Sequence, residues 1–227
     1  MLNTRCLAIG IRLALVFVLS GLVHAQSTVD TFEAPTLNPF WTLTQQYGTV
    51  HLSTDKNHTF AGKQSLKFVS SDGGQRDIFA THKYASPLKG TFSISFYDVA
   101  PNQETQYEQI SLYNSVTGDS VSIGTQDFDA YCYEAQLYNY NTKVQQGPNQ
   151  KCGTYPQTST TNVHRTAGWH ILSVFVGSDS ITLAIDGNAV FTGKGNYSYN
   201  TLQISQSGPV WRPDTYSYWD DFAGPVW

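Results

Sequence analysis

The sequence predicts a single all-β domain, and three observations lead to this prediction. Runs of β-branched and aromatic residues of strand length recur along the chain, as in "WHILSVFV" and "SITLAI". Turn signals such as Asp72-Gly73-Gly74 and Asp186-Gly187-Asn188 separate these runs. Beyond the first 25 residues, no helix-length stretch shows helical periodicity. Short strands at even spacing predict one antiparallel sandwich or barrel.

The first 25 residues have the pattern of a secretory signal peptide. Arg5 and Arg12 form a positive head, an apolar run covers 13–19, and Val23-His24-Ala25 offers small residues for cleavage. This run is too short to span a membrane, and no later segment reaches the roughly 20 apolar residues that a spanning helix needs. We therefore expect residues 1–25 to be removed. Residues 26–227 would then form one domain, exported to the extracellular space or the periplasm.

The charge and composition limit the class of partner. The signal peptide carries two of the 13 basic residues and none of the 17 acidic ones, so removing it changes the net charge from −4 to −6. A mildly acidic surface with few lysines argues against nucleic acid and anionic membranes as partners. Abundant Tyr, Asn, Gln, Ser and Thr suit a neutral partner that is bound by hydrogen bonds and ring faces. We expect a monomer.

Two cysteines remain after Cys6 leaves with the signal peptide. Cys132 and Cys152 form an even pair in an exported protein, which predicts a disulfide. Closing this loop would contribute about 3 kcal/mol in the chain-entropy estimate. Zinc is the alternative, but the pair lacks a C-x-x-C motif and nearby pairs of histidines. The surrounding segment 127–166 is dense in Tyr, Asn and Gln, so it is either a functional loop or a solubilising flap.

Four motifs resemble a known superfamily. "GWHILSVFVGSDSITLAIDGNAVFTGKG" (168–195) resembles the hairpin of concanavalin A-like and laminin-G-like jelly rolls. "VDTFEAPTLNPFW" (29–41), "AGKQSLKF" (61–68) and "YWDDF" (218–222) are similar to the ends of secreted carbohydrate-binding members. The motifs cover both ends and one hairpin. The resemblance implies a single-domain antiparallel β-sandwich of the jelly-roll type.

Adjacent carboxylates lie in an aromatic stretch near the C-terminus. Asp220 shares its strand face with two aromatic residues, where an unpaired carboxylate is costly. Similar jelly rolls hold calcium between the first and last strands. The resemblance therefore implies a structural calcium bound by Asp220 together with Glu33 or Asp30 and backbone carbonyls. Pairing of Asp220 with Arg212 or a hydroxyl, or solvation of both carboxylates, are the alternatives.

Catalytic carboxylates do not follow a familiar pattern. Retaining glycosidases need two carboxylates about 5–5.5 Å apart, and jelly-roll glucanases resembling this fold supply them as E-x-D-x-x-E or E-x-D-x-E on one strand. In "DFDAYCYE", Glu134 falls on the opposite strand face from the two aspartates. Jelly-roll lyases use a Tyr with His, Arg and Gln; the chain has His82, Arg76 and Gln109 without the lyase motifs. If the protein is an enzyme, its candidates are Glu104, Glu108, Asp127, Asp129 and Glu134.

These observations favour a secreted, lectin-like jelly roll that binds a polysaccharide without cleaving it. The alternatives are a glycoside hydrolase or polysaccharide lyase on the same fold, and an adhesion module with a protein partner. Sugar rings would stack on exposed aromatic side chains, while Asn, Gln and Asp would bind the hydroxyls. The expected aromatic residues are Tyr131, Tyr133, Tyr138, Tyr140, Trp211 and Tyr216.

Overall fold

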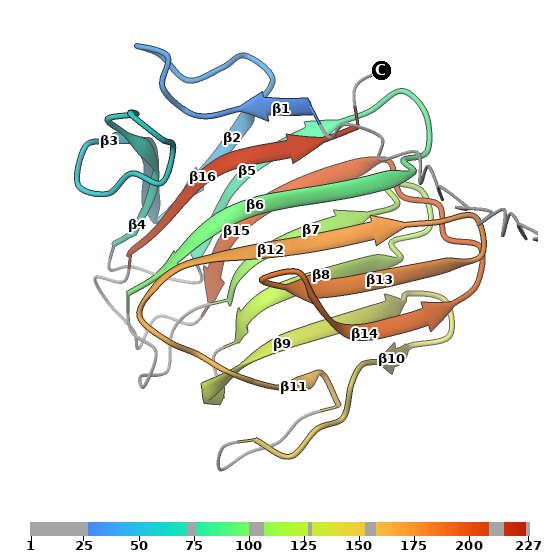
Figure 1. Ribbon diagram of the computed structural model, residues 1–227. Helices are drawn as coiled ribbons and strands as arrows, with labels where there is room; N and C mark the ends of the chain where they lie inside the picture. The colour runs from blue at the N-terminus through green and yellow to red at the C-terminus, as the bar shows by residue number, and fades with distance from the viewer. Residues whose placement is uncertain are drawn as a thin grey trace, which may run out of the picture.

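The computed structural model describes residues 27–71, 76–99, 107–126, 129–152, 158–208 and 216–225. The described residues form strands and no helix, so none of them forms a helix that could cross a membrane. The strands make two antiparallel sheets that stack as the layers of a sandwich (Figure 1). The predicted all-β sandwich is confirmed.

Sheet A contains both ends of the described chain. Its strands are β1 (Ser27–Asp30), β3 (Gly48–Ser53), β4 (Ser65–Ser70), β6 (Gly90–Asp98), β12 (Gly168–Val176), β13 (Ser180–Ile185), β14 (Asn188–Lys194) and β16 (Tyr216–Gly224). In space they run in the order β14-β13-β12-β6-β16-β4-β3, and β1 pairs with β16. The C-terminal strand therefore lies inside the sheet, and the N-terminal strand pairs with it.

Sheet B contains the segment around the two cysteines. Its strands are β2 (Thr42–Gln46), β5 (Arg76–Lys83), β7 (Tyr107–Tyr113), β8 (Ser120–Gln126), β9 (Asp129–Asn139), β10 (Val144–Gln146), β11 (Thr160–His164) and β15 (Thr201–Gly208). They run in the order β10-β9-β8-β7-β15-β5-β2, and β11 pairs with β9. The segment 127–166, expected to be a loop, thus contributes three strands.

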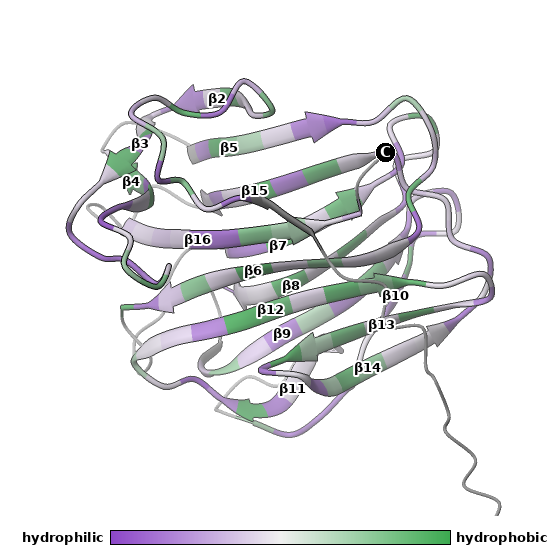
Figure 2. Ribbon diagram, turned by 45° about the horizontal axis from the view of Figure 1, so that its top comes forward, coloured by the Kyte–Doolittle hydropathy of each residue, from purple (hydrophilic) through white to green (hydrophobic). Residues whose placement is uncertain are grey.

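Alternating side chains build the core between the sheets. In β6, Phe92, Ile94 and Phe96 are fully buried, as the alternation in "TFSISFYDV" predicts. Ile110 and Leu112 of β7 are buried in the same core cluster from sheet B. Figure 2 shows the resulting alternation of hydrophobic and hydrophilic residues along the strands. Each such side chain contributes roughly 1.5–3 kcal/mol when fully buried.

One ion pair lies inside the sandwich. The Nε and Nη2 atoms of Arg165 donate to the two carboxylate oxygens of Asp98, both at 2.8 Å, and neither side chain is exposed. The Tyr133 hydroxyl donates to the same carboxylate at 3.2 Å. The pair connects the end of β6 to the segment between β11 and β12, so it joins the two sheets.

Replacing Arg165 by Met would leave the Asp98 carboxylate buried without its guanidinium. We expect the free energy of unfolding to fall by about 3–5 kcal/mol, measured by urea denaturation. The control is Lys67→Met, which removes the partner of the more exposed Asp55 and should cost far less because surface pairs contribute little. Equal losses in the two variants would contradict this prediction.

Candidate functional site

The outer face of sheet B is a polar surface. In β7, Ile110 and Leu112 point into the core, so Gln109 and Ser111 point outward, and cross-strand partners share that face. No third layer of described strands covers this face. The outer face of sheet B consists of Thr42, Thr44, Gln46, Asp77, Phe79, Thr81, Lys83, Tyr107, Gln109, Ser111, Tyr113, Ser120, Ser122, Gly124, Gln126, Glu134, Gln136, Tyr138, Thr201, Gln203, Ser205 and Ser207.

A row of amides and hydroxyls crosses the middle of this face. Strand register places Gln136, Ser122, Ser111, Gln203 and Thr81 side by side on five neighbouring strands. The Gln136 amide donates to the Ser122 hydroxyl at 3.1 Å. All five side chains can form hydrogen bonds and none carries a charge. The row therefore offers both donors and acceptors to a neutral ligand.

An aromatic row lies beside the row of amides and hydroxyls. Tyr138 of β9 and Tyr113 of β7 lie on either side of Ser120 of β8. Both rings are half-buried, and two strand spacings place them about 10 Å apart. The sequence analysis included Tyr138 but missed Tyr113. The signal for Tyr113 was present in "YEQISLY", where Gln109, Ser111 and Tyr113 alternate with buried residues.

The row on the other side contains a glycine that a larger residue could not replace. Glu134, Gly124, Gln109 and Ser205 are neighbours in register. Gly124 has a φ of 155°, and a Cβ there would lie 2.0 Å from the Glu108 carbonyl oxygen. Any side chain at this position would therefore collide with the backbone of β7.

The catalytic candidates are not brought together as a pair. Glu134 is 1% exposed on the outer side of β9 and accepts a hydrogen bond from the Thr160 hydroxyl at 3.0 Å. Glu108 is also 1% exposed, but it points into the core, where Thr125 Oγ1 donates to it at 3.3 Å. Opposite sides of a sheet cannot flank one glycosidic bond, so Glu108 and Glu134, the two candidates whose side chains the structure describes, cannot act together as a catalytic pair.

The other three candidate carboxylates cannot be placed. Glu104 and Asp127 lie outside the described residues, as does the side chain of Asp129. The residues that a lyase would use together also lie apart. His82 faces the core side of β5 and stacks on Phe40 with ring centroids 3.7 Å apart, whereas Gln109 is on the outer side. Arg76 begins β5, and its side chain is outside the described set.

The predicted aromatic residues scatter over the surface and the core. Tyr138 lies on the outer face of sheet B, Tyr131 is exposed at the start of β9, and Tyr140 is 52% exposed in the turn after β9. Tyr216 is exposed on sheet A, and Trp211 lies outside the described residues. These positions do not form one continuous platform.

Tyr133 is corrected from a surface residue to a core residue. It is fully buried, and its neighbours Ala135 and Leu137 on the same side of β9 are also buried. Burial raises the pKa of its hydroxyl, which donates to Asp98. A ring in this position cannot stack on a sugar from solvent.

Asp220 and Asp221 anchor the loop between β3 and β4. Asp220 is fully buried, and its carboxylate accepts from the backbone amides of His58 at 2.8 Å and Thr59 at 3.1 Å. Asp221 contacts His58 Nδ1 through Oδ2 at 2.6 Å. The two carboxylates in the aromatic stretch therefore hold the neighbouring loop, Asp220 through backbone amides and Asp221 through the side chains of His58 and Thr59.

The predicted calcium ligands each have hydrogen-bond partners. Asp30 accepts from a backbone amide and from the Trp41 indole at 2.9 Å. Glu33 accepts from two backbone amides of the β3–β4 loop, the same loop whose amides donate to Asp220. Among the described residues, Asp30, Glu33 and Asp220 do not form one group of three ligands. A calcium ion bound by Asp220 with Glu33 or Asp30 and backbone carbonyls stays a prediction. Arg212, the alternative partner, lies outside the described residues.

A further cluster of oxygens lies at the same place. Thr59 Oγ1 lies 2.6 Å from Asp221 Oδ1, 3.1 Å from Asp220 Oδ1 and 3.5 Å from the Thr31 carbonyl oxygen. One hydroxyl hydrogen can serve only one of these acceptors. Burial raises the pKa of Asp220, and the charge of Asp221 raises it further. Carboxylates and carbonyls are ligands that calcium prefers, so we predict that Asp221 and the Thr31 carbonyl can join Asp220 as ligands.

No protein-family model and no curated protein matches the sequence. Solved structures match the fold. A structure described as "Cellulose induced protein, Cip1" is 15% identical, with a TM-score of 0.61 over 85% of this chain and 94% of that chain. The laminarinase catalytic domain from Thermotoga maritima MSB8 is 10% identical, with a TM-score of 0.57 over 88% and 97%.

A Bacillus licheniformis β-glucanase is 10% identical, with a TM-score of 0.50 over 87% of this chain and 97% of that chain. At these identities the likeness shows the fold alone. The fold is the concanavalin A-like jelly roll that the sequence motifs imply.

The buried Glu108 makes stability depend on pH. Burial raises the pKa of Glu108 from 4.5 to about 8, so between these values the unfolded chain releases a proton that the folded protein keeps. The free energy of unfolding should therefore fall by roughly 1.4 kcal/mol per pH unit over this window. Glu108→Gln should flatten this slope and be more stable than the parent at pH 9. Urea denaturation at pH 5, 7 and 9 measures both curves; parallel curves would contradict the prediction.

Calcium should stabilise the protein through Asp221. At a calcium concentration roughly 100 times the Kd, we expect the melting temperature to rise by about 5–10 °C. In the Asp221→Asn variant most of this rise in melting temperature should be lost, because the side chain no longer carries the negative charge that attracts calcium. Asn tolerates the positive φ of 47° at this position, so the variant should keep the backbone conformation. Asp186→Asn is the matched control, with a φ of 50° and its own histidine contact. Scanning calorimetry with and without calcium measures the melting temperatures of both variants. An equal rise in Asp221→Asn and Asp186→Asn would contradict calcium binding at Asp221.

Proposed function

We propose that this protein binds a neutral polysaccharide on the outer face of sheet B without cleaving it. The observation that carries the proposal is the row of uncharged amides and hydroxyls beside the rings of Tyr113 and Tyr138. Sugar hydroxyls donate and accept hydrogen bonds, as Gln and Ser side chains do. The C–H faces of sugar rings pack on aromatic planes.

The charges of this face favour a neutral ligand over an anionic one. Among its described side chains, the charged groups are Lys83 at one edge and the carboxylates of Asp77 and Glu134. One lysine against two carboxylates is a poor attractor for a polyanion such as a lyase substrate. The weak fit of an anionic polymer agrees with the separation of His82 and Gln109 on opposite sides of the sheet.

The arrangement of carboxylates supports binding rather than cleavage. Glu134 is the one glutamate among the described side chains of this face, and Glu108 points the other way. The names of the matching structures, a cellulose-induced protein, a laminarinase and a β-glucanase, support a glycan as the ligand class. A glycan-active enzyme is the alternative function, because Glu134 faces the same surface.

Removing either ring should weaken binding. We expect Tyr113→Ala and Tyr138→Ala each to raise the Kd for the bound polysaccharide about tenfold, as aromatic contacts at binding sites commonly do. Pull-down on a panel of insoluble polysaccharides identifies the ligand, and calorimetry with soluble fragments measures the Kd. Tyr216→Ala, which removes an exposed ring from sheet A, is the control and should leave the Kd unchanged.

The same incubations distinguish binding from catalysis. Retention without released sugar or unsaturated product supports the proposal. If the parent protein releases product and the Glu134→Gln variant does not, the binding proposal is wrong and the enzyme alternative takes its place. Equal retention of all three tyrosine variants would place the binding surface elsewhere.

A further inference from the structure

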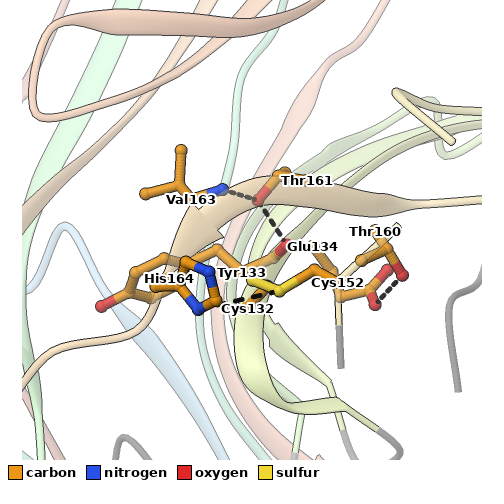
Figure 3. Close-up of a disulfide and its surroundings, with 8 residues drawn as sticks. All are labelled: Cys132, Tyr133, Glu134, Cys152, Thr160, Thr161, Val163 and His164. Carbon is orange, nitrogen blue, oxygen red and sulfur yellow. Dashed lines mark hydrogen bonds between the residues drawn. A yellow bond between two sulfur atoms is a disulfide. The ribbon is translucent and has the colours of Figure 1, made fainter. Parts of the chain in front are cut away.

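Three metal-binding side chains meet at one end of β9, beside the part of this strand that carries Gln136 and Tyr138 of the proposed glycan site. Cys132 near the start of β9 is joined by a disulfide to Cys152, which follows β10. His164 ends β11, and its Nδ1 lies 3.9 Å from the Cys152 sulfur (Figure 3). The two sulfurs and the ring nitrogen all lie within 4.8 Å of one another. The disulfide prediction is confirmed, and the histidine beside it is an addition.

Strand pairing brings the histidine to this place. His164 lies opposite Cys132 in the ladder between β11 and β9. His164 comes twelve positions after Cys152, and neither cysteine belongs to a C-x-x-C pair of a metal-binding motif. The sequence therefore gave no reason to group the three residues. Cys132 is fully buried and Cys152 is 7% exposed, whereas His164 is exposed to solvent.

The arrangement does not depend on the disulfide alone. The Thr161 hydroxyl donates to the Tyr133 carbonyl at 2.7 Å, which holds β11 against β9. On the cysteine side, the backbone amides of Asn149 and Gln150 donate to the carbonyls of Thr158 and Thr160, both at 2.9 Å. None of these hydrogen bonds involves a sulfur atom, so breaking the S–S bond removes none of them directly.

We propose that reduction of this disulfide creates a binding site for a soft divalent metal ion such as Zn²⁺. A thiol reductant supplies two electrons and two protons, so the S–S bond breaks, each sulfur becomes a thiol, and the reductant leaves as its own disulfide. The metal ion then displaces both thiol protons and binds two sulfurs and the imidazole nitrogen. With bond lengths of about 2.3 Å to sulfur and about 2.0–2.1 Å to nitrogen, a tetrahedral ion needs its ligand atoms roughly 3.5–3.8 Å apart. The 3.9 Å between the Cys152 sulfur and His164 Nδ1 is close to this distance, and the two sulfurs reach it by moving apart once the S–S bond is broken.

The site would be open to solvent on one side. Two cysteines and a histidine supply three of the four tetrahedral ligands, and water completes the set. The exposed His164 ring gives the ion a path from solvent. In the oxidised protein the sulfurs are bonded to each other, so the same residues cannot act as thiolates. Metal binding and the disulfide are thus mutually exclusive states of one cluster.

Cobalt titration of the reduced protein tests this proposal. The purified protein is reduced under native conditions with a phosphine, which is oxidised with oxygen from water, and then titrated with Co²⁺. We expect one equivalent of Co²⁺ to produce a thiolate-to-cobalt absorption band that Zn²⁺ removes. The oxidised protein should show no band. His164→Ala should weaken Co²⁺ binding at least tenfold, while His51→Ala, which changes an exposed histidine of β3, should match the parent.

Folding is followed in the same samples, because unfolded thiols also bind metal. Circular dichroism should show that the reduced protein keeps its β-sheet signal. The proposal is overturned if reduction unfolds the sandwich, if no band forms in the reduced protein, or if His164→Ala binds Co²⁺ as tightly as the parent.

Discussion

A β-strand places successive side chains on opposite sides of its sheet, and in this protein that constraint decides the character of the outer face of sheet B. β7 shows it most clearly. Ile110 and Leu112 supply the core, while Gln109, Ser111 and Tyr113 supply the polar surface. The same constraint sends Glu108 inward. One strand thereby contributes to the core, to the proposed binding surface and to a buried acid.

This alternation could be read from the sequence wherever a strand was recognised as one. "TFSISFYDV" gave the buried face of β6 correctly, and the turn signals together with the jelly-roll motifs gave the sandwich. The segment 127–166 was expected to be a loop, so alternation was applied to its carboxylates but was not used to separate buried from exposed tyrosines. β9 in fact runs through it, with Tyr133 inward and Tyr138 outward. Both are tyrosines, and only the strand register tells them apart.

The parts of the site that escaped prediction depend on contacts between distant segments. Asp220 was expected to need a cation because its strand neighbours are apolar. The structure instead gives it the backbone amides of His58 and Thr59, more than 160 residues earlier in the chain. No local pattern shows which loop will lie over the end of β16. For the same reason the sequence did not predict that His164 lies beside the disulfide, because the pairing of β11 with β9 brings it there.

β9 links the glycan surface to the cysteine–histidine cluster, because Cys132 lies on it two residues before Glu134 and on the same side of the sheet. An opening of the disulfide would act directly on the strand that carries Glu134, Gln136 and Tyr138. That strand, however, is held along its length by β8 on one edge and by β10 and β11 on the other. The disulfide closes the segment from Cys132 to Cys152, which contains the rest of β9 and all of β10. The hydrogen bonds between the strands hold this segment in the sheet independently of the disulfide. The outer face of sheet B should therefore keep its rows of side chains whether the disulfide is formed or reduced. Glycan binding and metal binding would then be independent of each other, although both use residues of β9.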